Sequence, residues 1–381
     1  MAVAATPVEA QSIDEILQLV TQNNKELQAG AQTAQAAKLE TQAPNNLEDP
    51  SVEYSPFYQK GVGGMVSSEL VVSQGFDFPT LYAARRKAGK LQSEAIDHQH
   101  EALRQDILLS AKSLCLDLIR LNQQQTLLDE RKKNADELLV LFEKRLAEGD
   151  AGILDVNKIK MERMNVQTEV AKNNAAHCTA LQQLLALNGN LPLTFSATDY
   201  PKTDPLPNYD AVYSEALAAD AALLAGNAEA RAAQEEVNVN KQSWLPKLSV
   251  GYRRNTDLNE KSNGFLVGGS LPLFSNRKKG KIARAQALGA QFRQDDALLK
   301  AEATLQGLYN EVKQLEEAMR AYDLPLMQET LSALKTAVTE GQLSVIDYYT
   351  EAENVYKNLE AYRDIENRYQ KAIAEIYKFR L

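Results

Sequence analysis

Apolar residues follow two different periods along this chain, and the two periods predict two kinds of element. Between about residues 79 and 147 they recur every seven positions, at Ile107, Leu114, Leu121 and Leu128. That spacing is typical of a coiled-coil helix. Over residues 65–78 apolar and polar residues alternate instead, with Leu70, Val72, Phe76 and Phe78 on one face. Alternation of this kind predicts a half-buried strand.

Applied to the whole chain, these patterns predict long helices separated by short strands. A capping box, Ser12-x-x-Glu15, opens a helix that ends before Pro44. The predicted strands are 51–58, 65–78, 247–254 and 265–274, with a turn over 255–264. The predicted helices are 12–42, 79–147, 155–187, 208–243, a long helix after 274 that is kinked or restarted at Pro325, and a last helix after Gly341.

The series of elements occurs twice, about 195 residues apart. Leu27-x-Ala29-Gly30 returns as Leu223-x-Ala225-Gly226, and the segment 148–155 returns as 340–347. We therefore expect a first copy over 1–190, a proline-rich linker over 191–207 and a second copy over 208–381. The fold class is mainly α with a small β part and an internal two-fold sequence repeat.

The predicted sheet and helices lack partners within one chain. Four strands with one apolar face are too few to close a barrel, and the long helices carry more apolar positions than one antiparallel pair covers. We therefore expect the chain to form an oligomer. The number of subunits does not follow from this argument.

Composition narrows the function classes. The 381 residues carry a net charge of −9, which argues against a nucleic-acid surface. Mean hydropathy is −0.39, and no apolar run reaches the ~20 residues of a membrane-spanning helix. The first ten residues, MAVAATPVEA, lack the features of a signal peptide.

The sequence offers no catalytic constellation and no expected cofactor. Cys115 and Cys178 lie within helical patterns and are expected to be buried. His98 and His100 stand two residues apart on a predicted helix and point to different sides, so we expect no metal site. The prediction is that the chain is not an enzyme.

Three segments carry a resemblance to a known family. LPKLSVGY at 245–252, FLVGGSLPLFSNRKKGKIARAQA at 265–287 and EGQLSVIDYYTEAE at 340–353 resemble the TolC-type outer-membrane efflux proteins in order and spacing. QGFDFPTLYAARRKAG at 74–89 is similar to the branch that serves heavy-metal cation exporters. The resemblance implies a homotrimer whose protomers each give four strands to one 12-stranded β-barrel, with the long helices forming a periplasmic α-barrel.

In that family the two turns between long helices form the periplasmic tip, where the adaptor protein docks and the channel narrows. The resemblance therefore places adaptor docking on Glu148, Gly149, Asp150, Gly152, Leu154, Glu340, Gly341, Gln342, Ser344 and Val345. Glycines at 149, 152 and 341 would permit the tight reversal.

Asp347, Asp155 and Glu351 are the gate candidates. The family often has a second aspartate where this chain has Thr350, and an arginine where it has Leu343. An alternative is that Asp155 and Asp347 only cap the returning helices.

Aromatic residues gather around the predicted strands, as in the girdle of a membrane barrel. They are Tyr54, Phe57, Phe76, Phe78, Trp244, Tyr252, Phe265 and Phe274; ordinary sheet-core aromatics are the alternative. Arg85, Arg86 and Lys87, and likewise Arg277, Lys278, Lys279 and Lys281, follow each second strand. They could meet lipid phosphates or form a solvated face.

The predicted function is a passive outer-membrane exit duct that docks a periplasmic adaptor and an inner-membrane pump. It would be located in the outer membrane of a Gram-negative bacterium and extend into the periplasm. The alternative is a soluble coiled-coil scaffold with a small β-domain. A scaffold should bury Leu70, Val72 and Phe76, and Leu248, Val250 and Tyr252, against helices.

Overall fold

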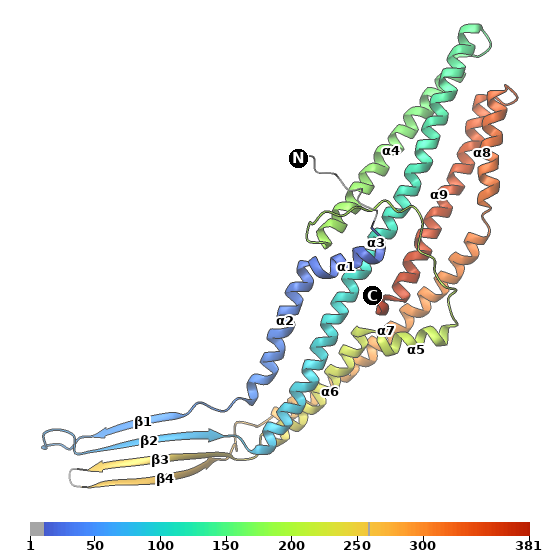
Figure 1. Ribbon diagram of the computed structural model, residues 1–381. Helices are drawn as coiled ribbons and strands as arrows, with labels where there is room; N and C mark the ends of the chain where they lie inside the picture. The colour runs from blue at the N-terminus through green and yellow to red at the C-terminus, as the bar shows by residue number, and fades with distance from the viewer. Residues whose placement is uncertain (1–10, 258–259) are drawn as a thin grey trace. The chain divides into compact units, whose positions relative to one another are not determined.

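The computed structural model describes residues 11–257 and 260–381, which fall into two compact units. One unit holds residues 1–28, 103–219 and 302–381, and the other holds 29–102 and 220–301. Figure 1 labels the elements of both. The absence of a signal peptide, predicted on residues 1–10, lies outside the described residues.

The helices and strands match the predicted order. The helices are α1 (Ile13–Asn23), α2 (Lys25–Gln42), α3 (Pro79–Glu148), α4 (Ile153–Leu187), α5 (Tyr209–Ala219), α6 (Ala221–Gln242), α7 (Lys279–Arg320), α8 (Leu324–Thr339) and α9 (Val345–Ile376), with short 3-10 turns η1 (Ala43–Asn45) and η2 (Lys378–Arg380). The strands are β1 (Ser51–Phe57), β2 (Ser67–Phe76), β3 (Lys247–Asp257) and β4 (Lys261–Ser270). The capping box at Ser12 and Glu15 is confirmed, and so is the restart near Pro325, which is the second residue of α8.

Two predicted helices are each broken once, which corrects the prediction of continuous helices over 12–42 and 208–243. The breaks fall at Asn24 and Asp220. The Leu27 amide donates to Asn24 Oδ1 at 2.9 Å, and the Leu223 amide donates to Asp220 Oδ1 at 3.0 Å. Each side chain satisfies a free N–H of a new helix, so each break is an N-cap.

The strands form one antiparallel sheet in the order β1-β2-β3-β4 (Figure 1). The prediction for the last strand, 265–274, was wrong at both ends. Arg254 and Asn255 continue the ladder opposite Asn263 and Ser262, so β4 begins at Lys261. It ends at Ser270, two residues before Pro272, which has no N–H to give to a ladder.

The register collects the apolar side chains on one face of the sheet. Directly opposite residues share a face, so Val52, Val72, Tyr252 and Phe265 form one row across all four strands. Leu248, Val250 and Val267 share that face. The other face carries mostly serine, glycine and charged residues: Ser51, Ser55, Glu69, Ser73, Ser249, Gly251, Arg253, Asn255 and Gly268.

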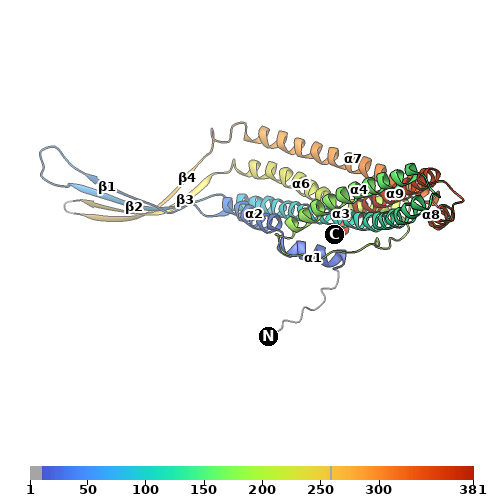
Figure 2. The same cartoon turned by 90° about the horizontal axis from the view of Figure 1, so that it is seen from above.

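The apolar face of the sheet is uncovered. Val52, Phe265 and Val267 are 69%, 93% and 84% exposed. Among the residues described, no helix of the same unit lies over either face of the sheet (Figures 1 and 2). Nor do β1 and β4 have a neighbour on their outer edges within the described chain.

The unit made of residues 1–28, 103–219 and 302–381 is stabilised by three clusters of apolar side chains between its helices. The first joins α1, α3 and α4 around Ile16, Leu118 and Leu184. The second joins α3, α4, α8 and α9, and the third joins α5, α7 and α9. None of the helices that the structure describes has the length and hydropathy needed to cross a membrane.

The prediction for the cysteines is half right. Cys115 lies in the first cluster, and burial raises the pKa of its thiol to about 12. Cys178 is exposed. It is two residues from the buried Ala180 of α4, a spacing that turns it to the opposite side of the helix.

Candidate docking and gating site

The two tip turns have the same backbone geometry. In the first, the Gly149 amide donates to Leu146 O at 3.2 Å and the Asp150 amide donates to Arg145 O at 2.8 Å. In the second, the Gly341 amide donates to Val338 O at 3.3 Å and the Gln342 amide donates to Ala337 O at 2.8 Å. These are Schellman ends. Gly149 and Gly341 have φ of +86° and +78°, the left-handed region that glycine adopts without strain.

The returning helices begin at Gly152 and Ser344, which are the N-caps of α4 and α9. Asp155 and Asp347 occupy the third helical position and are not the N-cap residues themselves, but both carboxylates bond back to the N-cap, so each aspartate does help to cap its helix. Asp155 Oδ2 accepts from the Gly152 amide at 3.1 Å, and Asp347 Oδ2 accepts from the Ser344 hydroxyl at 2.6 Å. Gly152 has φ of −88°, so the reversal does not require a glycine there.

Most of the predicted docking residues are at the surface. Leu154 is 73% exposed, and Glu148, Gly149, Asp150, Gly152, Glu340, Gly341, Gln342 and Ser344 are exposed as well. Val345 is the exception at 2%, because its side chain packs in the α3–α4–α8–α9 cluster. Its docking assignment is therefore corrected. Val345 supports the turn from inside.

The gate candidates differ in exposure. Asp347 and Glu351 are exposed, and Asp155 is half-buried. Each aspartate is held by the N-cap of its own helix, and no contact between the two is observed among the described residues.

Contacts that sequence reasoning missed join the two hairpins. Lys335 Nζ donates to Glu137 Oε2 at 2.6 Å and to Asn134 Oδ1 at 2.7 Å, which links α8 to α3. Arg145 donates to the carbonyl of Thr339. The sequence predicts the two helices but not which turns of α3 lie beside which turns of α8. These contacts could therefore not be predicted from the sequence.

Two adjacent tyrosines fill the cluster directly after Asp347. The ring centres of Tyr348 and Tyr349 are 4.9 Å apart with an angle of 68° between the ring planes, and burial raises the pKa of both phenols. Tyr349 Oη is buried without a hydrogen-bond partner in the part of the chain that is described. The first turn of α9 is thus anchored by large buried rings, while Asp347 stays exposed.

A buried arginine ties α3 to both returning helices. Arg131, 8% exposed, donates to Glu162 Oε1 at 2.9 Å and Glu169 Oε2 at 2.8 Å on α4. Its guanidinium lies 4.5 Å from the ring centre of Tyr356 on α9. Glu360 Oε1, also on α9, lies 3.9 Å from Arg131 Nη1. Burial lowers the pKa of Arg131, but the hydrogen bond and the charges of these carboxylates outweigh it and hold the net pKa above its usual value.

The predicted girdle aromatics do not all share one surface. Tyr54, Phe76, Tyr252 and Phe265 lie on the apolar face of the sheet, whereas Phe57 lies on the other face. Phe78, Trp244 and Phe274 lie just outside the strands.

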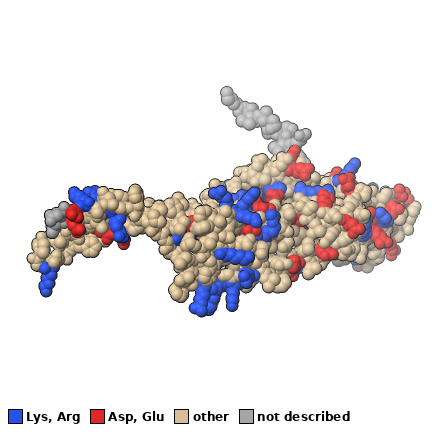
Figure 3. Space-filling view, turned by 90° about the horizontal axis from the view of Figure 1, so that it is seen from below, with Lys and Arg blue, Asp and Glu red and all other residues tan. Residues whose placement is uncertain are grey.

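The basic residues that follow the strands divide into paired and unpaired groups. Arg85 pairs with Asp77 at 2.6 Å, and Lys87 pairs with Glu235 at 2.6 Å. Arg277, Lys278, Lys279 and Lys281 are exposed, with no carboxylate partner among the residues described. Figure 3 shows lysine and arginine gathered over the helices next to the strands. Across the described residues, no group of three or more His, Cys, Asp or Glu could hold a metal ion.

Comparison with known proteins agrees with this architecture. Residues 212–329 match the family of outer membrane efflux proteins. The cobalt-zinc-cadmium resistance protein CzcC of Cupriavidus metallidurans is 26% identical over 214 residues, 54% of this chain and 50% of CzcC. The match thus spans about half the length of that curated relative.

Solved structures share the fold over the whole chain. A membrane protein from Pseudomonas aeruginosa superposes with a TM-score of 0.78 at 17% identity, covering 100% of this chain and 98% of that one. The Campylobacter jejuni CmeC outer membrane channel has a TM-score of 0.74 at 15% identity, covering 99% and 90%. This chain and the solved structures thus share one fold, which consists of long helices and a small sheet. The family match covers residues 212–329, and the likeness to the solved structures extends the shared fold to the rest of the chain.

Proposed function

We propose that this protein is the outer-membrane exit channel of a tripartite efflux system. Three protomers would each contribute four strands, 3 × 4 = 12, to one closed β-barrel. The long helices would line a periplasmic tunnel. In this proposal the protein catalyses no reaction, and export is driven by an inner-membrane pump.

One observation carries the proposal: the sheet has one continuous apolar face that the chain leaves uncovered, together with two unpaired edges. Strands with free N–H and C=O groups cannot be exposed to lipid, so such edges must pair with another protomer. The row Val52–Val72–Tyr252–Phe265 would then face the acyl chains, and the serine- and glycine-rich face would line the pore.

The same observation weighs against the soluble scaffold. A scaffold would bury the strand apolar residues against its own helices. Leu248, Val250 and Tyr252 are instead exposed, as is Val72. An uncovered apolar surface of this size on a monomer needs either a membrane or a partner.

The tip turns are the proposed contact with the periplasmic adaptor. Eight polar or glycine positions and Leu154 form the exposed surface of the two turns. Their shared Schellman geometry supports the proposed repeat of 1–190 and 208–381 around the linker 191–207, so that a trimer presents six similar turns. Asp347, exposed in each protomer, would place three carboxylates at the narrow end, with Asp155 and Glu351 nearby.

The proposed cargo is a divalent metal cation. The support is the name of the relative CzcC, a cobalt-zinc-cadmium resistance protein, and the exposed Asp347 and Glu351. Carboxylates attract cations and would favour their passage.

Extraction and mass measurement test the proposed class. A channel should leave the membrane only with detergent and have the mass of three chains. A chain that is stable as a monomer in plain buffer would favour the scaffold.

A further inference from the structure

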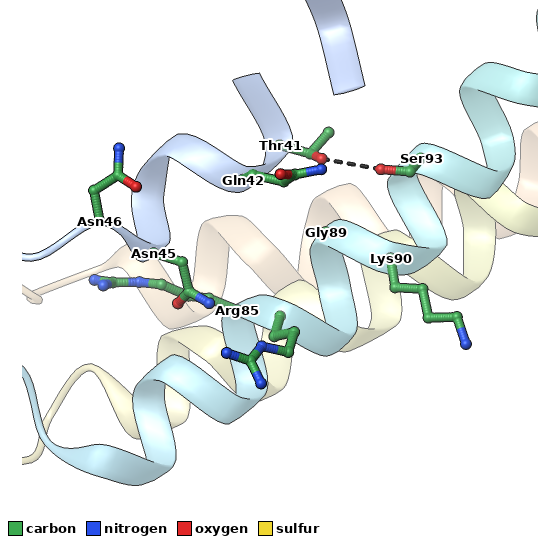
Figure 4. A pocket seen from close by; sticks show the side chains of 9 residues that line it. Thr41, Gln42, Asn45, Asn46, Arg85, Gly89, Lys90 and Ser93 are labelled. Carbon is green, nitrogen blue, oxygen red and sulfur yellow. Dashed lines mark hydrogen bonds between the residues drawn. The ribbon is translucent and has the colours of Figure 1, made fainter. Parts of the chain in front are cut away.

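A preformed pocket with unpaired basic residues lies between the end of α2 and the start of α3. It has a volume of about 600 Å³ and is lined by Thr41, Gln42, Asn45, Asn46, Arg85, Arg86, Gly89, Lys90 and Ser93. Figure 4 shows Thr41, Gln42, Asn45 and Asn46 at the end of α2, beside Arg85, Gly89, Lys90 and Ser93 of α3. The lining includes three cationic side chains and no carboxylate.

Close helix packing builds the floor of this pocket. A Cβ on Gly89 would meet the Thr41 carbonyl oxygen at 2.9 Å, so only glycine lets the two helices approach here. The Thr41 and Ser93 hydroxyls form a hydrogen bond of 3.0 Å across the same contact (Figure 4). These two contacts fix the spacing of the two helices that line the pocket.

The three cations of the pocket are not equally available. Arg85 is held, because it donates to Asp77 Oδ2 at 2.6 Å and to the Pro44 carbonyl at 3.0 Å. Arg86 and Lys90 form no ion pair or hydrogen bond with any described residue. Nearby acids are already engaged, since Glu235 pairs with Lys87 and Asp97 pairs with Lys38. Two positive charges without a protein partner in the described part of the chain thus line one pocket.

The pocket also offers an acceptor without a donor. Asn45 Oδ1 is buried and has no hydrogen-bond partner among the residues that the structure describes. A buried acceptor of this kind is costly unless something donates to it. A ligand for this pocket would therefore carry negative charge for Arg86 and Lys90 and a hydroxyl or ammonium donor for Asn45.

We propose that this pocket binds a phosphate ester, and that its physiological source is the headgroup of a glycerophospholipid. The assignment of a lipid source rests on the proposed function. The pocket lies beside the segments that enter β1 and leave β2, so it would be level with the periplasmic leaflet of the outer membrane. Arginine and lysine bind phosphate oxygens by charge-assisted hydrogen bonds.

The test measures binding of three soluble probes to the purified full-length protein in non-ionic detergent by titration calorimetry. The probes are dihexanoyl-phosphatidylglycerol, dihexanoylglycerol without phosphate, and inorganic phosphate. The double variant Arg86→Gln/Lys90→Gln should bind the phospholipid at least about tenfold more weakly than the parent. Lys132→Gln/Lys172→Gln removes two exposed charges elsewhere on α3 and α4 and should bind like the parent.

Each outcome decides the proposal. Inorganic phosphate binding as tightly as the phospholipid, with the same loss in the double variant, supports the site but assigns it to soluble phosphate. Equal affinity of parent and double variant, or equally tight binding of dihexanoylglycerol, overturns it. Lys90→Glu, a single change at an exposed side chain, should show the same loss if the double variant unfolds.

Channel conductance separates this proposal from the proposed function. Arg86→Gln/Lys90→Gln should conduct like the parent in a planar bilayer. A parent that binds phosphate but forms no channel contradicts the proposed function and leaves the pocket assignment standing.

Discussion

Lys335 Nζ lies 2.6 Å from Glu137 Oε2, so one ion pair joins the second tip hairpin to the first. Lys335 also donates to Asn134, whereas the pair between Lys160 and Glu143, at 2.9 Å, stays within the first hairpin. Movement of the second hairpin away from the first would break the Lys335–Glu137 pair but would leave the Lys160–Glu143 pair intact.

Lys335→Met should loosen α8 against α3 and raise the conductance of the closed channel. The pair is partly exposed, so the free energy of unfolding should change by less than about 1 kcal/mol. Lys160→Met is the matched control and should leave conductance unchanged. Single-channel recordings of both variants check this; equal conductance in the two would show that the second hairpin does not move independently.

Asp347→Ala should widen the tip and weaken block by divalent cations. In the proposed trimer it removes three carboxylates, and it also removes the acceptor for the Ser344 hydroxyl. Ser344→Ala removes the same hydrogen bond but keeps the carboxylate of Asp347, and it serves as control. If Asp347→Ala keeps the parental conductance and cation block, Asp347 acts only in capping α9.

Arg131→Met should destabilise the protein by about 2 kcal/mol, because it leaves the partly buried carboxylates of Glu162 and Glu169 without this partner. Thermal unfolding of the variant, followed by circular dichroism, measures the loss. Arg163→Met breaks an exposed pair with Asp136, at 2.7 Å, on the same two helices and should change the midpoint little.

The loss in Arg131→Met should also depend on pH. Burial raises the pKa of Glu169, which Arg131 partly offsets, so removing Arg131 should raise that pKa further. A carboxyl group whose pKa is higher in the folded state favours folding at low pH and loses that contribution as pH rises through its folded pKa. The variant should therefore be closest to the parent near pH 5 and furthest from it at pH 7. A pH-independent difference would contradict this role of Glu169, and Glu169→Gln in the variant should remove the pH dependence.

Val267→Lys should abolish stable insertion of the proposed trimer in the membrane, while Ser249→Lys should be tolerated. The two positions lie at the same level of the sheet, because Val267 is opposite Val250 and Ser249 is the next residue. They lie on opposite faces. A lysine facing lipid near the midplane costs about 2–4 kcal/mol, whereas one facing the pore is hydrated. Equal amounts of both variants in the membrane fraction would contradict the assignment of the faces.

Much of the fold could be predicted from local patterns. The helix predicted over 79–147 matches α3 within one residue, and Gly149 and Gly341 permit the tight reversals expected of them. What failed depended on partners that a pattern does not reveal. Asn24 and Asp220 interrupt helices with good helical sequence because their side chains cap the next helix. The polar ends of β3 and β4 extend the ladder because each strand supplies hydrogen bonds to the other.

The positions of the two turns could be predicted from the sequence, but the contacts around them could not. The aspartates were expected at the helix starts, and they lie within the first turn. Lys335 and Glu137 are 198 residues apart in sequence, and only the packing of α3 with α8 brings them together. Val345 was assigned to the surface because it lies in the turn, yet its apolar side chain is buried in the cluster below.

Single-channel recording of the full-length protein in a planar lipid bilayer tests the central claim most directly. The account predicts that the purified species has the mass of three chains and inserts as a channel with steady, cation-selective conductance. A monomer that stays folded in detergent-free buffer and produces no conductance would contradict it.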